Sequence, residues 1–310
     1  MMTEKPYQRQ QMNPALQFVV FLALTVGLII VGQLLGLAAA YIFYGSDAVK
    51  QILHMNISTP QATHALWAIQ LLGTTLPIGL IPVLFALIVK EPNAYLKTNI
   101  NFRPILLMAV LLIMVASTPI LQVLINFNQR MVLPQWLKGL EDWMRSSEQM
   151  AQKAMMAMLQ MNTVWDCIVN VLLIGLLTAF VEELMFRGCL QTILVRWTKS
   201  THAAIWITAA LFSAFHMEFF GFLPRLMLGV LFGYFAAWSG SIWPAVWAHF
   251  INNGTDVVLV YLYQHKKLAG NPDSPYVFNY SWYILSVLIT VALLYAYRAI
   301  ALNKHQAYLH

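Results

Sequence analysis

Long apolar runs recur from one end of this chain to the other, separated by shorter polar stretches. A helix needs about 20 mostly apolar residues to cross a bilayer, and the runs are of about that length. We therefore predict an all-α fold, a polytopic membrane helix bundle with about eight transmembrane helices. The predicted spans are 15–44, 65–89, 104–125, 163–190, 201–217, 222–239, 241–263 and 279–301.

Short links, prolines and glycines predict how the spans pack. Because the links between the fifth, sixth and seventh spans are very short, these helices should be antiparallel neighbours. Pro77 and Pro82 predict kinks in the second span, since proline lacks the N–H of a helical hydrogen bond. Gly229 and Gly233 form a GxxxG pattern, which favours close helix packing.

A more polar stretch, residues 126–162, separates the third span from the fourth. Its segment 135–161 mixes Met, Leu and Trp residues with charged ones. This mixture predicts an amphipathic helix, which would lie at the bilayer interface or pack as a cover on the bundle.

The composition agrees with a membrane protein. The chain is 60% hydrophobic and 10% charged, whereas soluble domains carry about 25% charged residues. We interpret residues 1–310 as a single integral membrane domain in contact with the lipid bilayer. The net charge of +6 fits the positive-inside rule better than nucleic-acid binding, and it predicts that both termini are cytoplasmic. Lys5 and Arg9 precede a run too long for a cleaved signal peptide, so we expect an uncleaved first span.

The two cysteines, Cys167 and Cys189, fall in or beside the fourth span. On one helix they would be about 33 Å apart at a rise of about 1.5 Å per residue, which excludes a mutual disulfide.

The strongest polar pattern lies inside the fourth span. Residues 180–187 read Phe-Val-Glu-Glu-Leu-Met-Phe-Arg. Ionised groups at this depth cost about 2.5–3.5 kcal/mol each, so they need partners and indicate a functional site. Glu183 and Arg187 are four residues apart and are predicted to pair on one helix face. Glu182, turned by about 100° from Glu183, should then point elsewhere.

Further polar residues occur on two other spans. His216 ends the fifth span, and the seventh carries His249 and Asn253 four residues apart, with Asp256 three residues further on. Lipid offers these groups no partner, so Glu182 and the two imidazoles are expected to converge. A carboxylate and an imidazole can activate a shared water, and an imidazole and a carboxamide can stabilise an oxyanion.

Three short motifs follow one another in the second half of the chain: Glu182-Glu183-x-x-x-Arg187, Phe212-x-x-x-His216 and His249-x-x-x-Asn253. They resemble the ordered motifs of the CPBP family. This family includes the CAAX prenyl endopeptidases and the bacterial Abi-type, bacteriocin-processing homologues. The resemblance predicts a catalytic core over residues 163–263.

The resemblance also implies roles. Glu182 would activate water together with His216, while His249 and Asn253 would line the oxyanion site. Three residues are expected to support this geometry: Glu183, Arg187 and Asp256. The substrate would be a membrane-associated protein or peptide, processed in a CAAX-like or leader-peptide manner, and the location a bacterial inner membrane.

No cofactor follows with certainty from these residues. Glu182, His216 and His249 could instead ligate a divalent metal such as zinc. We favour metal-free chemistry, because Asn253 shares a helix face with His249, and a carboxamide is a poor zinc ligand but a good oxyanion donor.

Other functions remain open. Intramembrane Glu, His and Arg residues also build proton relays in transporters, but no inverted repeat is visible between the two halves. A non-catalytic membrane immunity or scaffold protein on the same fold is the second alternative.

Overall fold

A computed structural model describes residues 12–268 and 280–306, and the described residues form helices with no strand among them. The first helix, α1 (Pro14–Leu53), is longer than predicted. Gly45 interrupts it with a φ of 86°, a left-handed value that glycine adopts readily. The break lies one residue beyond the predicted end of the first span.

The second predicted span consists of three consecutive segments: α2 (Pro60–Ala68), the π-helical η1 (Ile69–Thr75) and α3 (Leu76–Val89). The wide π-helical turn ends immediately before the first turn of α3, where Pro77 lies. Since Pro77 has no N–H, it cannot bond the Gly73 carbonyl, which instead accepts from Gln33 Nε2 of α1 at 3.3 Å. At Pro77, where a kink was predicted, the helix therefore contains a π-helical segment, which is hydrogen-bonded to α1.

The remaining elements follow in chain order: α4 (Pro92–Leu96), α5 (Ile105–Gln129), η2 (Gln135–Leu137), α6 (Lys138–Met158), α7 (Val164–Asn170), η3 (Val171–Leu177), α8 (Thr178–Glu183), η4 (Leu184–Leu190), α9 (Gln191–Thr198), α10 (Thr201–Phe215), η5 (Phe219–Gly221), α11 (Phe222–Ser239), α12 (Trp243–Gln264) and α13 (Tyr280–Gln306). Segments α7 to α9 form one continuous helix, in which η3 and η4 are π-helical. Each predicted span corresponds to a helix or to a run of consecutive helical segments. Residue 279, the first of the eighth predicted span, lies outside the described residues.

Within the described residues, six helices are long and apolar enough to cross a membrane. Of the other two predicted spans, α10 has only 15 residues. Helix α12 has 22 residues, but His249, Asn252, Asn253 and Asp256 lower its hydropathy. The all-helical membrane fold is confirmed, and a total of about eight spans stays a prediction.

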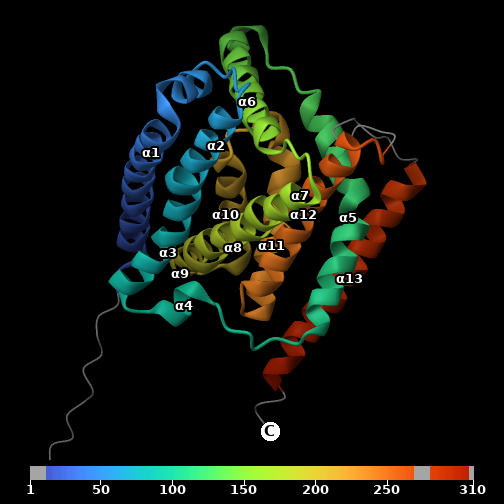
Figure 1. The fold of residues 1–310 in the computed structure, drawn as a ribbon. Coiled ribbons are helices and arrows are strands. Elements are labelled where there is room, and N and C mark those ends of the chain that lie inside the picture. Colours follow the sequence, from blue (N-terminus) through green and yellow to red (C-terminus); the bar gives the residue numbers. More distant parts are fainter. Residues whose placement is uncertain (1–11, 269–279, 307–310) are drawn as a thin grey trace, which may run out of the picture.

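The helix α7–α9 crosses the middle of the bundle (Figure 1). Helices α1 to α3 lie on one side of it, the pair α5 and α13 lies on the other, and α6 lies at the top. Helices α10, α11 and α12 pack against it, which brings the three predicted motifs into the same region.

The GxxxG pattern serves close packing between α10 and α11. A Cβ added at Gly229 would lie 3.0 Å from Ala209 Cβ, and one at Gly233 only 2.8 Å from Ile205 Cγ2. The Gly229 carbonyl also accepts a hydrogen bond from Arg187 Nη2 of η4 at 3.1 Å.

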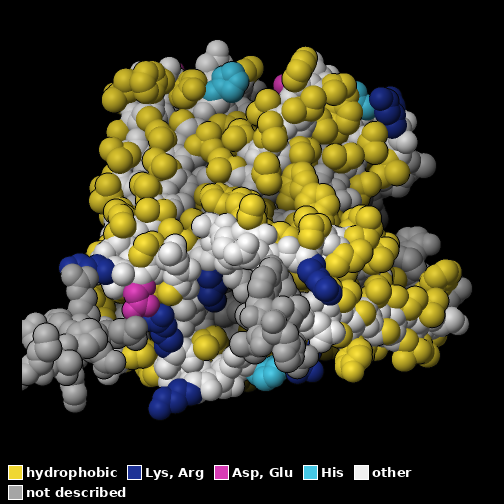
Figure 2. Space-filling view, turned by 90° about the horizontal axis from the view of Figure 1, so that it is seen from below, with side chains coloured by type: hydrophobic (Ala, Val, Ile, Leu, Met, Phe, Trp, Pro, Cys, Tyr) yellow, Lys and Arg dark blue, Asp and Glu magenta, His cyan; other side chains and the backbone are white. Residues whose placement is uncertain are grey.

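The outer surface is apolar over most of its area. Large side chains on α1 are widely exposed, among them Ile42 at 72% and Phe43 at 76%, as expected of a lipid-facing helix. On the face seen from below, most Lys and Arg side chains lie in the lower half of the view, and the upper half is largely apolar (Figure 2). The protein is therefore an integral membrane protein. Lys5 and Arg9, which the sequence placed on the cytoplasmic side, lie outside the described residues.

The segment 135–161 is helical in η2 and α6, as predicted. Glu141 on its inner face bonds Arg145 Nε at 2.9 Å and the Leu133 N–H at 3.0 Å, whereas Trp136 is 80% exposed. Its placement at a bilayer surface stays a prediction. Cys167 and Cys189 are both buried and free, which confirms the absence of a mutual disulfide.

Candidate active site

The two adjacent glutamates lie at a change of helix type. Glu182 and Glu183 end α8, and the π-helical η4 begins at Leu184. A π-helical turn is wider than an α-helical one, and such turns occur frequently at functional sites. Both carboxylates are buried, with Glu183 fully inaccessible and Glu182 8% exposed.

Glu183 and Arg187 form the ion pair predicted from their spacing. Arg187 Nη1 lies 2.6 Å from Glu183 Oε1, and neither side chain is exposed. The guanidinium carbon also lies 4.5 Å from the Phe212 ring centroid and 5.3 Å from that of Phe232. Two aromatic faces and a carboxylate therefore stabilise a charge that has no access to water.

Glu183 also bonds His249, a contact that the sequence did not predict. The same oxygen, Oε1, lies 2.9 Å from His249 Nδ1. The His249 ring stacks on Phe232, with centroids 5.2 Å apart and planes inclined by 23°. Since an ionised carboxylate only accepts hydrogen bonds, we assign the Nδ1 hydrogen of His249 to this bond. Glu183 thereby links α12 to the fourth span.

His216 follows the last residue of α10 and is fixed by the preceding turn. Its Nδ1 lies 2.8 Å from the Phe212 carbonyl oxygen, and its ring meets the Phe212 ring edge-on at 4.9 Å. Because a carbonyl oxygen cannot donate, Nδ1 carries the hydrogen and Nε2 presents a lone pair in the neutral ring. The side chain is 25% exposed, more than any other imidazole or carboxylate of this cluster.

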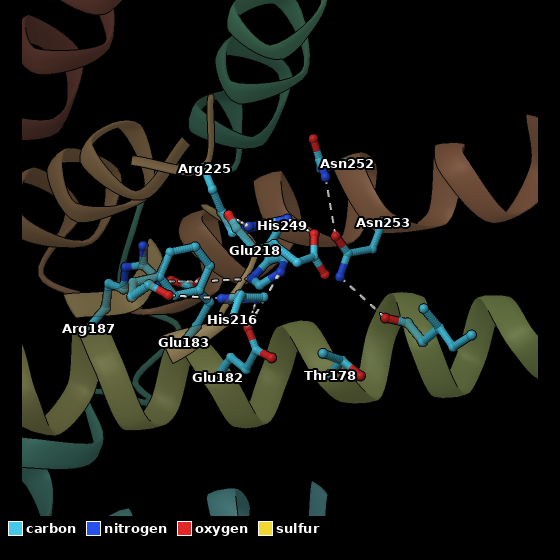
Figure 3. Close-up of polar contacts among 12 residues, drawn as sticks. Thr178, Glu182, Glu183, Arg187, His216, Glu218, Arg225, His249, Asn252 and Asn253 are labelled. Atoms are coloured by element: carbon cyan, nitrogen blue, oxygen red, sulfur yellow. Dashed lines mark hydrogen bonds and ion pairs between the residues drawn. The ribbon is translucent and has the colours of Figure 1, made fainter. Parts of the chain in front are cut away.

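Glu182 faces both imidazoles (Figure 3). Its Oε2 lies 3.8 Å from His216 Nε2 and 3.9 Å from His249 Nε2. These separations are too long for direct hydrogen bonds, and Glu182 Oε2 has no such partner among the described residues. One water can bridge groups at this spacing, since it bonds each of them at about 2.8 Å.

Asn253 lies one helical turn beyond His249 and points toward the fourth span (Figure 3). Its Nδ2 donates to the Ile174 carbonyl in η3 at 3.4 Å, and its Oδ1 accepts from Asn252 Nδ2 at 3.2 Å. The π-helical turn supplies the Ile174 carbonyl as an acceptor for a neighbouring helix. The amide therefore keeps one N–H for another acceptor.

The structure thus brings together Glu182, His216 and His249, with Glu183 and Arg187 behind His249. Asp256 is exposed on α12, one turn beyond Asn253. A further ion pair lies beside the site, between Glu218 and Arg225 (Figure 3). The sequence analysis missed this pair, although two opposite charges so near His216 in a weakly charged chain were an available signal.

The three central groups have the donor chemistry of a zinc site. However, two ligands of one tetrahedral zinc ion lie about 3.4 Å apart when each bond is about 2.1 Å, and the observed separations are 3.8 and 3.9 Å. Within the described part of the chain, no group of three or more His, Cys, Asp or Glu side chains is arranged to hold a metal ion. In the arrangement observed, these residues do not fit a metal centre.

Comparison with known proteins points to one family. Residues 164–255 match the family model described as type II CAAX prenyl endopeptidase Rce1-like. This match contains all three motifs and confirms the resemblance predicted from them. It supports a protease of the CAAX type at the level of the family.

A curated bacterial protein is also similar to this chain. The uncharacterized protein YpbD of Bacillus subtilis (strain 168) is 31% identical over 86 residues. The alignment covers 26% of this chain and 41% of that protein, so the similarity concerns a segment of each. No solved structure matches the chain significantly.

Proposed function

From the premise that residues 164–255 are similar to type II CAAX prenyl endopeptidases, we propose that this chain is an intramembrane endopeptidase. It hydrolyses a peptide bond in a membrane-associated protein or peptide by direct attack of water. One observation carries the proposal: a buried carboxylate oxygen of Glu182 faces the Nε2 atoms of His216 and His249 at water-bridging distance.

In the proposed reaction, Glu182 is the general base. A water between the helices donates one hydrogen to Glu182 Oε2 and the other to His216 Nε2, which holds a lone pair because Nδ1 is bonded to the Phe212 carbonyl. Glu182 removes the first proton as the water oxygen attacks the carbonyl carbon. The carbon–nitrogen bond then breaks, and the leaving amine takes this proton from Glu182.

The positive charge of a protonated His249 would stabilise the developing oxyanion. With protons on both nitrogens it donates Nδ1–H to Glu183 and aims Nε2–H at the site. In this state the carboxylates of Glu182 and Glu183 would be matched by the charges of Arg187 and the imidazolium. Preorganised donors of this kind stabilise a tetrahedral intermediate strongly when water is excluded.

Asn253 is proposed as the second oxyanion donor. The bond from Nδ2 to the Ile174 carbonyl and the bond from Asn252 to Oδ1 fix the amide plane. The remaining N–H is then available to a substrate carbonyl that enters beside His249. This placement needs no rotation of the side chain out of its observed bonds.

The reaction is proposed to be metal-free. Asn253 shares a helix face with His249, and a carboxamide is a poor zinc ligand but a good oxyanion donor. The orientation of both Nε2 atoms is provided by protein acceptors, the Phe212 carbonyl and Glu183.

The proposed location is a bacterial inner membrane with both termini in the cytoplasm. Lys90, Lys97 and Lys199 are the C-cap residues of α3, α4 and α9, and Arg103 lies just before α5. Arg196 near the end of α9 pairs with Glu91, which follows Lys90. An excess of basic residues marks the cytoplasmic side of membrane proteins. A substrate processed in a CAAX-like or leader-peptide manner fits this setting.

A comparison of membrane peptides tests the proposed activity. Membranes that contain the native protein should yield cleavage products that are absent from membranes with Glu182→Gln. Asp142→Asn is the matched control. Asp142 is an exposed carboxylate on α6, and its side chain forms an ion pair with Lys138. Identical peptide profiles for the native protein and Glu182→Gln would instead favour a non-catalytic membrane protein on this fold.

A further inference from the structure

The turn after His216 is short and needs external support. Helix α10 ends at Phe215, and the His216 N–H reaches the Ser213 carbonyl only at 3.4 Å. Met217 then adopts a left-handed φ of 56° before η5 begins at Phe219. Left-handed backbone is unfavourable for a residue with a Cβ, so neighbouring contacts must hold this turn.

Arg225, in the first turns of α11, holds the turn at two points. Its Nη2 forms an ion pair with Glu218 Oε2, and its Nη1 donates to the backbone carbonyl of the same residue at 3.3 Å. A Cβ added at Gly221 would lie 3.1 Å from Arg225 Nη2. The glycine therefore makes room for the guanidinium beside the turn.

Two other helices hold the far end of the turn. Asn128 of α5 donates to the Phe219 carbonyl at 3.0 Å and accepts from the Leu223 N–H at 2.6 Å. Glu148 of α6 accepts from the Phe220 N–H at 3.1 Å. These bonds fix η5, whereas the Glu218–Arg225 pair fixes the backbone two residues from His216.

The pair lies on the side of the two imidazoles that faces away from Glu182 (Figure 3). The Glu218 side chain is 31% exposed and the Arg225 side chain 20%, so this ion pair is partly buried. Neither residue takes part in the proposed reaction. Replacing Arg225 would remove both contacts and free the Glu218 backbone and, through it, the direction of His216, whereas replacing the Glu218 side chain would remove only the ion pair that holds the guanidinium there.

We propose that the Glu218–Arg225 pair is a positioning element that orients His216 toward Glu182. This inference rests on the proposed function, in which His216 binds the attacking water. Arg225 acts through the turn and does not touch the reacting atoms, so its loss should lower kcat and leave KM nearly unchanged.

The first test does not depend on hydrolysis. Purified protein in lipid nanodiscs is treated with diethyl pyrocarbonate, and peptide mass spectrometry measures the modification rate of His216. His202, exposed at the other end of α10, is the internal reference. In Arg225→Met, the His216 rate relative to His202 should rise several-fold, because Nε2 is no longer held in the site. Arg130→Met, which removes an exposed arginine at the end of α5, is the matched control and should leave the ratio unchanged.

The second test uses a peptide cleaved by the native protein. We expect Arg225→Met to lower kcat by about 10- to 100-fold with KM within about twofold of native, since small misplacements of reacting groups have effects of this size. Arg225→Lys should recover part of the loss. The double variant with Glu218→Gln should be no slower than Arg225→Met, because both changes break one interaction.

The outcomes separate the two proposals. An unchanged His216 modification ratio in both Arg225→Met and Glu218→Gln would overturn the positioning role, whatever the activity. Additive losses of kcat would also overturn it. A raised ratio in a protein that cleaves no peptide would retain the positioning role and reject the proposed protease activity. Glu218→Gln keeps the backbone contact to Arg225 and serves as the second variant if Arg225→Met does not fold.

Discussion

Glu183 Oε1 lies 2.9 Å from His249 Nδ1 and also accepts the Arg187 guanidinium at 2.6 Å. One carboxylate oxygen therefore joins a structural ion pair to the imidazole that faces Glu182. The two adjacent glutamates have different positions, since Glu182 points into the site while Glu183 accepts the Nδ1 hydrogen of His249 and fixes the orientation of its ring.

This arrangement predicts a functional cost for a change that keeps the size of Glu183. In Glu183→Gln the neutral amide no longer balances the His249 imidazolium, so kcat should fall by at least about 100-fold. Steady-state kinetics on a cleaved peptide measures the change. Glu91→Gln is the control, because Glu91 also bonds an arginine, Arg196, but lies at the start of α4 and outside the candidate site. Native turnover by Glu183→Gln would show that His249 needs no anionic partner.

Arg187→Ala should lower both stability and rate. The substitution leaves the fully buried Glu183 carboxylate without its main counter-charge, and breaking such a pair costs about 3–5 kcal/mol. Thermal unfolding in detergent should show a clear drop in the midpoint. Arg196→Ala, which removes a partly exposed pair, should have a smaller effect. An inactive Arg187→Ala protein that melts like the native one would assign Arg187 to the chemistry itself.

Asn253→Ala removes the proposed second oxyanion donor. Loss of one such donor reduces kcat by about 100- to 1,000-fold in proteases, and KM should change little because the interaction forms in the transition state. Kinetics of the purified variant provides the measurement. A change confined to KM would place Asn253 in substrate binding instead.

Lys97 offers a pH test outside the membrane-spanning segments. Burial, with the nearby charge of Arg196 acting in the same direction, lowers the pKa of Lys97 to about 8. The pKa of a lysine in an unfolded chain is about 10.4, so between these two values the unfolded state binds more protons and folding becomes more favourable as pH rises. The unfolding temperature should therefore rise from pH 8 to 10 relative to Lys97→Met. If the unfolding temperatures of the two proteins changed in parallel with pH, the lowered pKa of Lys97 would not be the cause.

The metal-free proposal has its own measurement. Protein dialysed against a chelator should keep its peptidase activity and contain far less than one zinc ion per chain by elemental analysis. If zinc is present at one ion per chain and activity follows its removal and return, Glu182, His216 and His249 must move closer to act as ligands.

The helices and the main ion pair were predictable because both depend on local spacing. Apolar runs located the helices of the predicted spans, an amphipathic mixture located α6, and a separation of four residues predicted the bond between Glu183 and Arg187, whereas the short α4 was not predicted. The contact from Glu183 to His249 was not predictable, because it depends on how α12 is rotated against the fourth span. The π-helical η3 and η4 likewise leave no clear local pattern, although η3 supplies the acceptor that holds Asn253.

The central claim is that Glu182 and His216 activate a water for peptide hydrolysis. Its most direct test is turnover of a defined peptide by purified, folded native protein, Glu182→Gln and His216→Ala. The account predicts cleavage by the native protein and none by either variant, with unfolding temperatures close to native for Glu182→Gln. Substantial turnover by either folded variant would contradict it.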